Sequence, residues 1–124
     1  MRDWIHVADH CAAIALVLEK GKAGNVYNVG AENEKTNLEI VELILENLGK
    51  PRSLIRYVKD RPGHDRRYAI DNTRIRTELG FRVTVSFETG ISETVRWYVE
   101  NRAWWERIKT GEYMEYYDKW YGGR

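Results

Sequence analysis

Apolar residues recur along the chain in short segments whose spacing predicts helices alternating with short strands. Residues 4–7 predict a strand, and a helix is expected over about residues 9–20, with Gly21 as its C-cap. Apolar side chains at residues 12–18 cover nearly the whole circumference of this helix. Because a helix that is apolar all round needs burial on more than one side, we expect some of its packing partners to lie outside this chain.

Residues 26–29, between two glycines, predict a second strand. Thr36 and Glu39 then have the spacing of a capping box, in which each residue accepts a hydrogen bond from the backbone amide of the other. The helix that follows is expected to run to about Leu48 and to end at Gly49. Its core-facing stripe is predicted to hold four apolar residues, namely Leu38, Val41, Leu45 and Leu48.

The middle of the chain is predicted to be extended at residues 54–58 and again at residues 67–70. Asp71 or Thr73 is expected to cap a brief helix over residues 74–79, which the following glycine ends.

A last long helix is expected to start near Ser86 or Phe87, and the aromatic and charged residues 113–121 predict another helical turn or two. The aromatic residues at positions 97, 98, 104 and 105 resemble a stacking platform for nucleic acid. Without a basic groove they are better interpreted as core or interface aromatics. Five residues recur at helical spacing and form a stripe that is apolar except for the arginine: Ile91, Val95, Tyr98, Arg102 and Trp105.

The composition, with 43% hydrophobic and 31% charged residues, is that of a soluble globular protein. A net charge of +1 argues against a partner that is nucleic acid or a membrane. The longest apolar run, residues 11–18, is too short to span a membrane. Cys11 is the only cysteine, so no intrachain disulfide is possible and a reducing, cytoplasmic setting is expected. Its place in a helical pattern predicts a buried, inert thiol. Arg2 and Asp3 lead directly into a predicted strand, and no signal peptide is expected.

Three residues near the start, His6, Asp9 and His10, have spacing that could be interpreted as a metal site. His6 falls in a predicted strand and no further ligand set follows, whereas a zinc site needs three or four ligands. Chance spacing is the better interpretation.

A charged run, residues 60–71, places three arginines, a histidine and a tyrosine within eight positions behind a Pro-Gly turn. Arginine forks bind phosphate oxygens bidentately, so the run predicts a small ligand that carries a pyrophosphate. The alternative is a solvated turn with ordinary ion pairs. Arg66 and Arg67 are expected to be structural, each pairing with Asp60, Asp65 or Asp71.

The block Arg61-Pro62-Gly63-His64-Asp65-Arg66-Arg67-Tyr68 resembles the signature of dTDP-glucose 4,6-dehydratases, which belong to the extended short-chain dehydrogenase/reductase family. Further blocks keep that family's order from Arg2 to about Glu106. They are residues 2–11, 25–30, 33–39 and 87–91, followed by Trp97-Tyr98 and Trp104-Trp105.

The resemblance implies an α/β fold in which this chain is the C-terminal portion of such an enzyme. Residues 1–32 would complete a Rossmann-type, cofactor-binding sheet as strand, helix and strand, and residues 33–124 would form the smaller substrate-binding lobe with C-terminal helices. The family uses NAD to convert dTDP-glucose into dTDP-4-keto-6-deoxyglucose and water. Because the apolar helix at residues 9–20 and the strand after it would lack their usual packing partners, we also expect a homo-oligomer.

Two motifs of the family are missing from this sequence. No Gly-x-x-Gly-x-x-Gly follows a predicted strand, and no tyrosine has a lysine four residues later. We therefore expect the chain by itself to lack catalytic residues and a cofactor-binding motif, and to contribute substrate binding.

Five residues are the candidates for that binding, because the resemblance places them against the nucleotide and the diphosphate of dTDP-glucose. Arg61 and His64 flank the Pro-Gly turn, and Tyr68 offers a phenol on an apolar edge. Asn37 lies in the first turn of a capped helix, where it could face an anion or simply belong to the cap. The candidate set is Arg2, Asn37, Arg61, His64 and Tyr68.

The sequence is also compatible with other functions. The chain could be a free-standing, non-catalytic module that binds a nucleotide sugar or phosphate, or an inactive truncation that associates with itself. GDP-mannose, UDP-glucose and UDP-glucuronate are alternative substrates within the same resemblance, although the Arg-Pro-Gly-His block favours dTDP-glucose.

Overall fold

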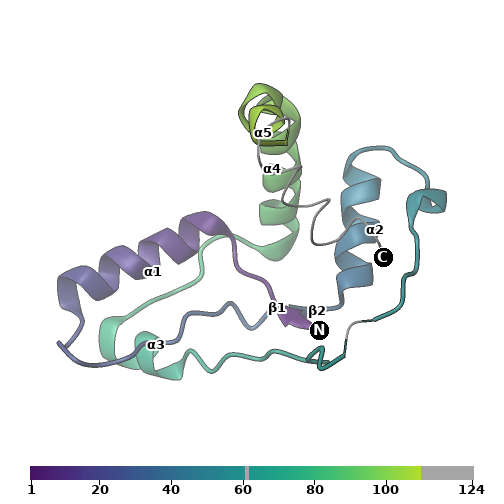
Figure 1. Ribbon diagram of the computed structural model, residues 1–124. Helices are drawn as coiled ribbons and strands as arrows, with labels where there is room; N and C mark the ends of the chain where they lie inside the picture. The colour runs from purple at the N-terminus through teal and green to yellow at the C-terminus, as the bar shows by residue number, and fades with distance from the viewer. Residues whose placement is uncertain (61, 110–124) are drawn as a thin grey trace. The chain divides into compact units, whose positions relative to one another are not determined.

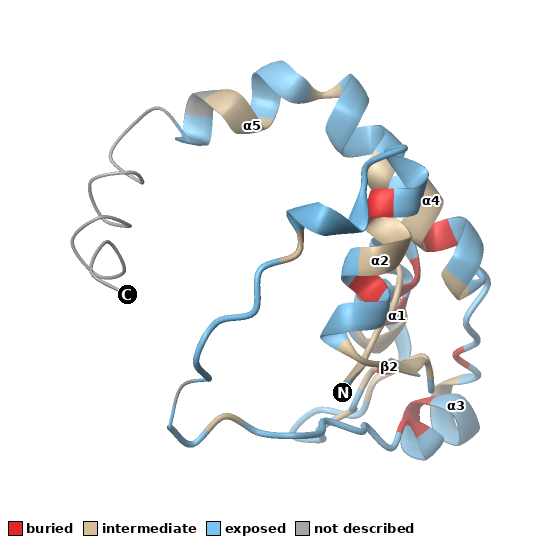
Figure 2. Ribbon diagram, turned by 90° about the vertical axis from the view of Figure 1, so that its right-hand side faces the viewer, coloured by how far each residue is buried: buried red, intermediate tan, exposed pale blue. Residues whose placement is uncertain are grey.

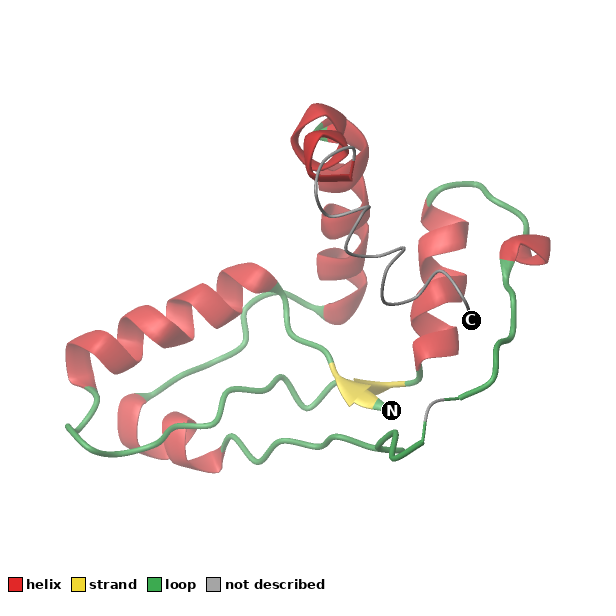
Figure 3. Cartoon of the chain, viewed as in Figure 1, coloured by secondary structure: helices red, strands yellow, loops and turns green. Residues whose placement is uncertain are grey.

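The computed structural model describes residues 1–60 and 62–109, and most of its regular structure is helical (Figures 1 and 3). It divides into two units, Met1–Ser92 and Glu93–Arg124, and each is described by itself. The expected boundary between residues 32 and 33 stays a prediction. The elements in chain order are β1 (Arg2–Asp3), α1 (Val7–Lys20), β2 (Glu34–Lys35), α2 (Asn37–Asn47), the 3₁₀ helix η1 (Arg52–Leu54), α3 (Thr73–Leu79), α4 (Phe87–Glu100) and α5 (Arg102–Lys109).

β1 and β2 form a short antiparallel ladder in which Arg2 lies opposite Lys35 and Asp3 lies opposite Glu34. The prediction of a strand at residues 4–7 was wrong, because Val7 already begins α1. Backbone pairing decides where a strand lies, and in the first unit the pairing partner of β1 is two residues long.

α1 begins two residues earlier than expected and ends at Lys20 as predicted. Gly21 caps it with an extended backbone, not a left-handed one, and its amide donates to the Val17 carbonyl at 2.8 Å. The predicted burial of Cys11 was wrong, since this residue is exposed. Ala13 is fully buried on the opposite face of α1, so only one side of the helix is covered within this unit.

The predicted strand at residues 26–29 was also wrong, since no described residue forms a ladder with it. Tyr27 and Val29 nevertheless pack against the core, while Val26 is 74% exposed. The alternation of inward and outward side chains is that of a strand, but a strand needs a neighbour for its backbone hydrogen bonds.

α2 confirms the capping-box prediction. The Glu39 amide donates to Thr36 Oγ1 at 3.2 Å, and the Thr36 amide donates to the Glu39 carboxylate at 2.6 Å. The helix ends at Asn47, close to the predicted end. Of the predicted stripe only Leu45 is buried, and Ile40 is the other buried residue of α2.

No strand is assigned to residues 54–58, where a β-like segment was predicted, although Ile55 has an extended backbone. A 3₁₀ helix occupies Arg52–Leu54, and Tyr57 and Val58 are more than four-fifths exposed. Residues 67–70 form no assigned strand, although the amide of Tyr68 donates to the carbonyl of Met1 at 3.0 Å.

The core of the first unit is small and consists of Ala13, Ile75 and Phe81 with partly buried neighbours from α1, the following loop and α3. Buried residues accordingly appear only as short red stretches in Figure 2. α3 confirms the predicted brief helix: the Thr73 amide donates to Asp71 Oδ1 at 2.8 Å, and Gly80 ends the helix in the left-handed region at φ 76°. Asn72, in the N-cap position, donates to the Gly30 carbonyl at 2.8 Å.

Asp9 ties α1 to the segment that precedes α4. Its side chain is 2% exposed and accepts hydrogen bonds from the Thr84 amide at 3.1 Å, the Thr84 hydroxyl at 2.6 Å and the Val85 amide at 3.0 Å. Burial by itself raises the pKa of Asp9, but these hydrogen bonds outweigh it and hold the pKa below its ordinary value.

The single long helix predicted near the end is divided into α4 and α5 at Asn101. The side chain and the amide of Asn101 both donate to the Trp97 carbonyl at 2.9 Å. Trp97 meets the rings of Tyr98 and Trp104 edge-on, with centroids 5.2 Å apart in each case. These aromatics therefore pack against each other, but each remains exposed, so they form no core within this unit and an interface role stays a prediction. The predicted turns at residues 113–121 lie outside the described residues.

Three apolar side chains on one face of α1 remain uncovered: Val7 is 65%, Ile14 56% and Leu18 87% exposed. None of the helices in the part of the chain that the structure describes is long and apolar enough to cross a membrane. Exposed apolar patches of this kind mark interfaces or sites of association.

We therefore expect the isolated chain to associate with itself through this face of α1, and Leu18→Glu to weaken the association by at least about tenfold, because Leu18 would otherwise be buried between copies. Val58→Glu is the matched control, since Val58 is also apolar and 86% exposed but lies elsewhere. Sedimentation equilibrium measures both variants. An unmodified chain that stays monomeric at high concentration would contradict the prediction.

Candidate functional site

Arg2, His64 and Tyr68 converge although two of them are 62 or more residues from the first. Arg2 Nη2 lies 3.0 Å from His64 Nε2, and the guanidinium carbon lies 4.6 Å from the centroid of the Tyr68 ring. We call these three residues the basic cluster. Three of the five candidate residues are thus brought together by the fold.

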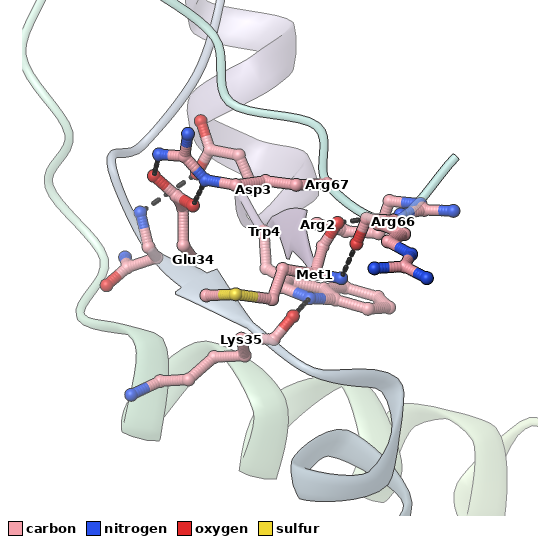
Figure 4. A network of polar contacts seen from close by, with 9 residues as sticks. Met1, Arg2, Asp3, Trp4, Glu34, Lys35, Arg66 and Arg67 are labelled. Carbon is pink, nitrogen blue, oxygen red and sulfur yellow. Dashed lines mark hydrogen bonds and ion pairs between the residues drawn. The ribbon is translucent and has the colours of Figure 1, made fainter.

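Backbone pairing beside β1 makes this convergence possible. The Met1 amino group donates to the Arg66 carbonyl at 2.6 Å (Figure 4). The Tyr68 amide donates to the Met1 carbonyl at 3.0 Å. The charged run therefore passes alongside the start of β1. Within this run, Gly63 has a φ of 70° and supplies the left-handed backbone conformation that the turn before His64 requires.

His64 is held from both sides of its ring. Its Nδ1 lies 2.7 Å from Asp60 Oδ1, and its Nε2 faces Arg2. A guanidinium can only donate hydrogen bonds, so Nε2 must accept and the ring proton must lie on Nδ1, directed at Asp60.

Tyr68 is half-exposed, and its hydroxyl donates to the carboxylate of Asp65. Its ring faces the Arg2 guanidinium, which is a cation–π contact. Arg2 also donates to the Met1 carbonyl at 2.7 Å. The cluster thus presents a guanidinium held between an imidazole and a phenol ring.

Arg67 is structural as predicted, but its predicted partner was wrong. It forms a bidentate pair with Glu34 of β2, with both nitrogen–oxygen distances at 2.5 Å (Figure 4). The hydrogen bonds from Arg67 hold the pKa of Glu34 below its ordinary value, and Glu34 raises the pKa of Arg67. This pair fastens the charged run to the β1–β2 ladder.

Arg66 does not form the predicted pair with a neighbouring aspartate. Within the described residues its side chain makes no ion pair, and its carbonyl accepts from Met1. These aspartates form hydrogen bonds with other residues: Asp60 bonds His64, Asp65 bonds Tyr68, and Asp71 accepts from the Thr73 amide at the start of α3.

Asn37 is the first residue of α2, two positions after Lys35, which lies opposite Arg2. No hydrogen bond among the described residues joins it to the basic cluster. Glu39 already places a carboxylate at this helix end, and the hydrogen bonds from Thr36 hold the pKa of Glu39 below its ordinary value. The cap is therefore complete without an anion. Arg61 lies outside the described residues, and its role stays a prediction.

An open groove of about 630 Å³ lies elsewhere in the first unit, along α2 and the start of α4. Four glutamates line it, at positions 39, 42, 46 and 88, with Lys35 as the basic residue among its lining. Such a surface repels a diphosphate, so the basic cluster is the better anion site.

Comparison with known proteins assigns the chain to a family. The family model for GDP-mannose 4,6 dehydratase matches residues 1–94. The chain belongs to the GDP-mannose 4,6-dehydratase family.

Relatives within this family carry a more specific name. The chain is 56% identical over 109 residues to a dTDP-glucose 4,6-dehydratase of Streptomyces niveus, covering 88% of this chain and 32% of that protein. It is 46% identical to one of Escherichia coli, covering 100% of this chain and 36% of the relative. The chain thus spans about a third of the length of the curated relatives it matches.

A solved structure gives the same result for the fold. The crystal structure of the dTDP-glucose 4,6-dehydratase of Streptomyces venezuelae, with NAD and TYD bound, matches with a TM-score of 0.81 and 50% identity, covering 86% of this chain and 33% of that one. The predicted fold class is confirmed: the structural neighbours are extended short-chain dehydrogenase/reductases, and this chain corresponds to their C-terminal part.

The described residues of this dehydratase-family chain do not fit the pyrophosphate of NAD. A dinucleotide-binding turn runs from a strand through glycines into a helix N-terminus. Here β1 passes into α1 through Trp4, Ile5 and His6, and β2 passes into α2 through Thr36, so neither connection contains a glycine.

Two supporting residues escaped the sequence-based prediction, Asp3 and Gly30. Asp3 accepts from the Ala31 amide at 3.1 Å and the Asn33 amide at 2.9 Å, which fixes the entry to β2. A Cβ added at Gly30 would lie 2.3 Å from Asp3 Oδ2, so only glycine allows this approach. Both residues fall in blocks of the family resemblance, which is the one signal that could have revealed them.

Proposed function

We propose that this chain is the nucleotide-sugar-binding C-terminal part of an NAD-dependent dTDP-glucose 4,6-dehydratase. The complete enzyme would convert dTDP-glucose into dTDP-4-keto-6-deoxyglucose and water. The names of the relatives support the choice of reaction, and the ligands named with the structure from Streptomyces venezuelae support NAD as its cofactor.

The convergence of Arg2, His64 and Tyr68 carries the proposal. A diphosphate needs several donors from one side, and arginine offers a planar fork that matches two phosphate oxygens. Arg2 is only partly buried and His64 is within hydrogen-bond reach of it. An incoming phosphate can therefore replace the Arg2–His64 contact without disturbing the core.

Each candidate residue has a distinct part in this proposal. Arg2 would bind the diphosphate bidentately, and Tyr68 would hold a phosphate oxygen or lie under the base. His64 would add a donor beside Arg2. Arg61 and Asn37 complete the set on the strength of the resemblance alone. These residues would bind and orient the substrate, which raises the rate by fixing the reacting geometry and not by proton or hydride transfer.

We expect the isolated chain to form no 4-keto sugar, even when NAD and dTDP-glucose are supplied, because its sequence has neither the Tyr-x-x-x-Lys pair nor a glycine-rich cofactor motif. Product formation is measured by chromatography against a control without protein. Keto-sugar formation above that control would contradict the proposal that this chain binds the substrate while the rest of the enzyme supplies the catalytic residues.

A chimaera tests whether this chain can serve as the substrate-binding part of an active enzyme. The chain would replace the matched C-terminal third of the Streptomyces venezuelae enzyme, which has 50% identity to it. We expect the chimaera to regain dehydratase activity on dTDP-glucose and to prefer it to UDP-glucose and GDP-mannose. A folded chimaera that binds none of these nucleotide sugars would refute the proposed function.

A further inference from the structure

Two basic groups face each other in the basic cluster, and while no anion lies between them their proximity favours a neutral imidazole beside the guanidinium. Arg2 Nη2 and His64 Nε2 are 3.0 Å apart, and arginine keeps its charge at all ordinary pH values. The lone pair of Nε2 therefore accepts from Arg2, while Nδ1 donates to Asp60 across 2.7 Å. Without ligand, the neutral ring bridges a cation and a carboxylate.

A bound diphosphate changes what Nε2 must do. Phosphate oxygens accept hydrogen bonds, and the Arg2 fork that now points at His64 would turn toward them. Nε2 would then face an anion with a lone pair, which is unfavourable. If Nε2 takes a proton from solvent, it becomes a donor to the phosphate, and Asp60 still accepts from Nδ1.

We propose that binding of the diphosphate is coupled to uptake of one proton at His64 Nε2, and that Asp60 is the positioning residue that stabilises the resulting imidazolium. The proton comes from solvent, and no bond of the ligand is broken. A carboxylate on the far nitrogen favours the charged ring, as an opposite charge does for any titrating group. This inference rests on the proposed function, because it needs the diphosphate at the basic cluster.

The charged and titratable surroundings of His64 fit this assignment. Arg2 approaches from β1 and Asp60 from the same segment as His64. The nearby carboxylate of Asp65 is already bonded by the Tyr68 hydroxyl, whose ring lies against Arg2. Asp60 is thus the carboxylate that bonds the ring directly among the described residues.

Calorimetry with dTDP-glucose measures the uptake. Titrations of the full chain at about pH 7.5, in two buffers that differ in ionisation enthalpy, report the number of protons exchanged, and an ordinary histidine is mostly neutral at that pH. A terminal phosphate has a second pKa of about 6, but in dTDP-glucose this phosphate carries the sugar, so the ligand contributes no proton of its own.

We expect an uptake of nearly one proton per ligand, with affinity that rises as the pH falls. His64→Gln should abolish the uptake, and Asp60→Asn, which keeps an acceptor for Nδ1 but removes the charge, should reduce it strongly. Asp71→Asn is the matched control, because this carboxylate of the same run accepts from the Thr73 amide and not from the basic cluster, and it should leave the uptake unchanged. Circular dichroism confirms that each variant is folded.

Nitrogen NMR of the free chain provides a readout that needs no ligand. The inference requires the His64 ring to carry its proton on Nδ1, and Nε2 protonation in the free chain at about pH 7.5 would overturn it. Binding of dTDP-glucose without proton uptake, or uptake that persists in His64→Gln, would overturn the inference and leave the proposed function intact. Failure of the chain to bind dTDP-glucose at all would overturn both.

Discussion

Arg2→Ala is expected to weaken the binding of dTDP-glucose by about ten- to a hundredfold, which corresponds to the roughly 1.5–3 kcal/mol of a charge-assisted hydrogen bond. Arg2 is the member of the basic cluster that contacts both others, through His64 Nε2 and the Tyr68 ring. Its removal takes away the guanidinium fork and leaves His64 without its donor. Isothermal titration calorimetry measures the change.

Arg66→Ala is the matched control for this prediction. Arg66 lies in the same run but makes no ion pair within the described residues, so its loss should change the affinity little. Arg61→Ala is expected to weaken binding far more than Arg66→Ala, and His64→Ala less than Arg61→Ala. Equal losses for Arg2, Arg61 and Arg66 would mean that binding depends on overall charge and that the charged run is only a solvated turn.

Asp9→Ala is expected to lower the free energy of unfolding by about 3 kcal/mol, because it removes a buried carboxylate that accepts three hydrogen bonds, from the backbone amides of residues 84 and 85 and from the Thr84 hydroxyl. The Asp9 carboxylate makes three hydrogen bonds while only 2% exposed. Urea unfolding followed by circular dichroism measures the loss. Asp71→Ala is the control: this carboxylate also accepts from a backbone amide but lies at the surface, so its loss should matter less.

The same carboxylate predicts how stability depends on pH. The folded-state pKa of Asp9 is lower than its ordinary value, so protonation favours the unfolded chain. The contribution of Asp9 is therefore fully present above an ordinary aspartate pKa of about 3.9 and is lost as the pH falls through the lower, folded-state pKa. Asp9→Ala should flatten the acid limb of the stability curve, and an unchanged acid limb would contradict this assignment.

Helix boundaries were the most predictable part of the fold. α2 has its capping box and α3 ends at Gly80 as the sequence indicated, because the partners of these hydrogen bonds lie within four residues of each other. The strands were the least predictable. Residues 4–7 and 26–29 have apolar patterns suited to a sheet, but a strand exists only where another segment bonds it, and β2 is the partner of β1 in the described chain.

The residues of the candidate site were predictable from the sequence, but the contacts that hold them were not. The family resemblance selected Arg2, His64 and Tyr68, and the fold brings all three together. The resemblance could not say which carboxylates hold them: Asp60 bonds His64 and Asp65 bonds Tyr68, and neither hydrogen bond was predicted.

By itself the sequence determined the capped helices, the membership of a dehydratase family and the residue types available to bind a diphosphate. Only the tertiary structure decided that Arg67 pairs with Glu34, 33 residues away, that Cys11 is exposed and that the His64 ring lies between Arg2 and Asp60. The physical reason is the range of the interactions. A helix cap is formed by neighbours in sequence, whereas an ion pair, a buried face or a tautomer depends on which distant segments the fold brings into contact.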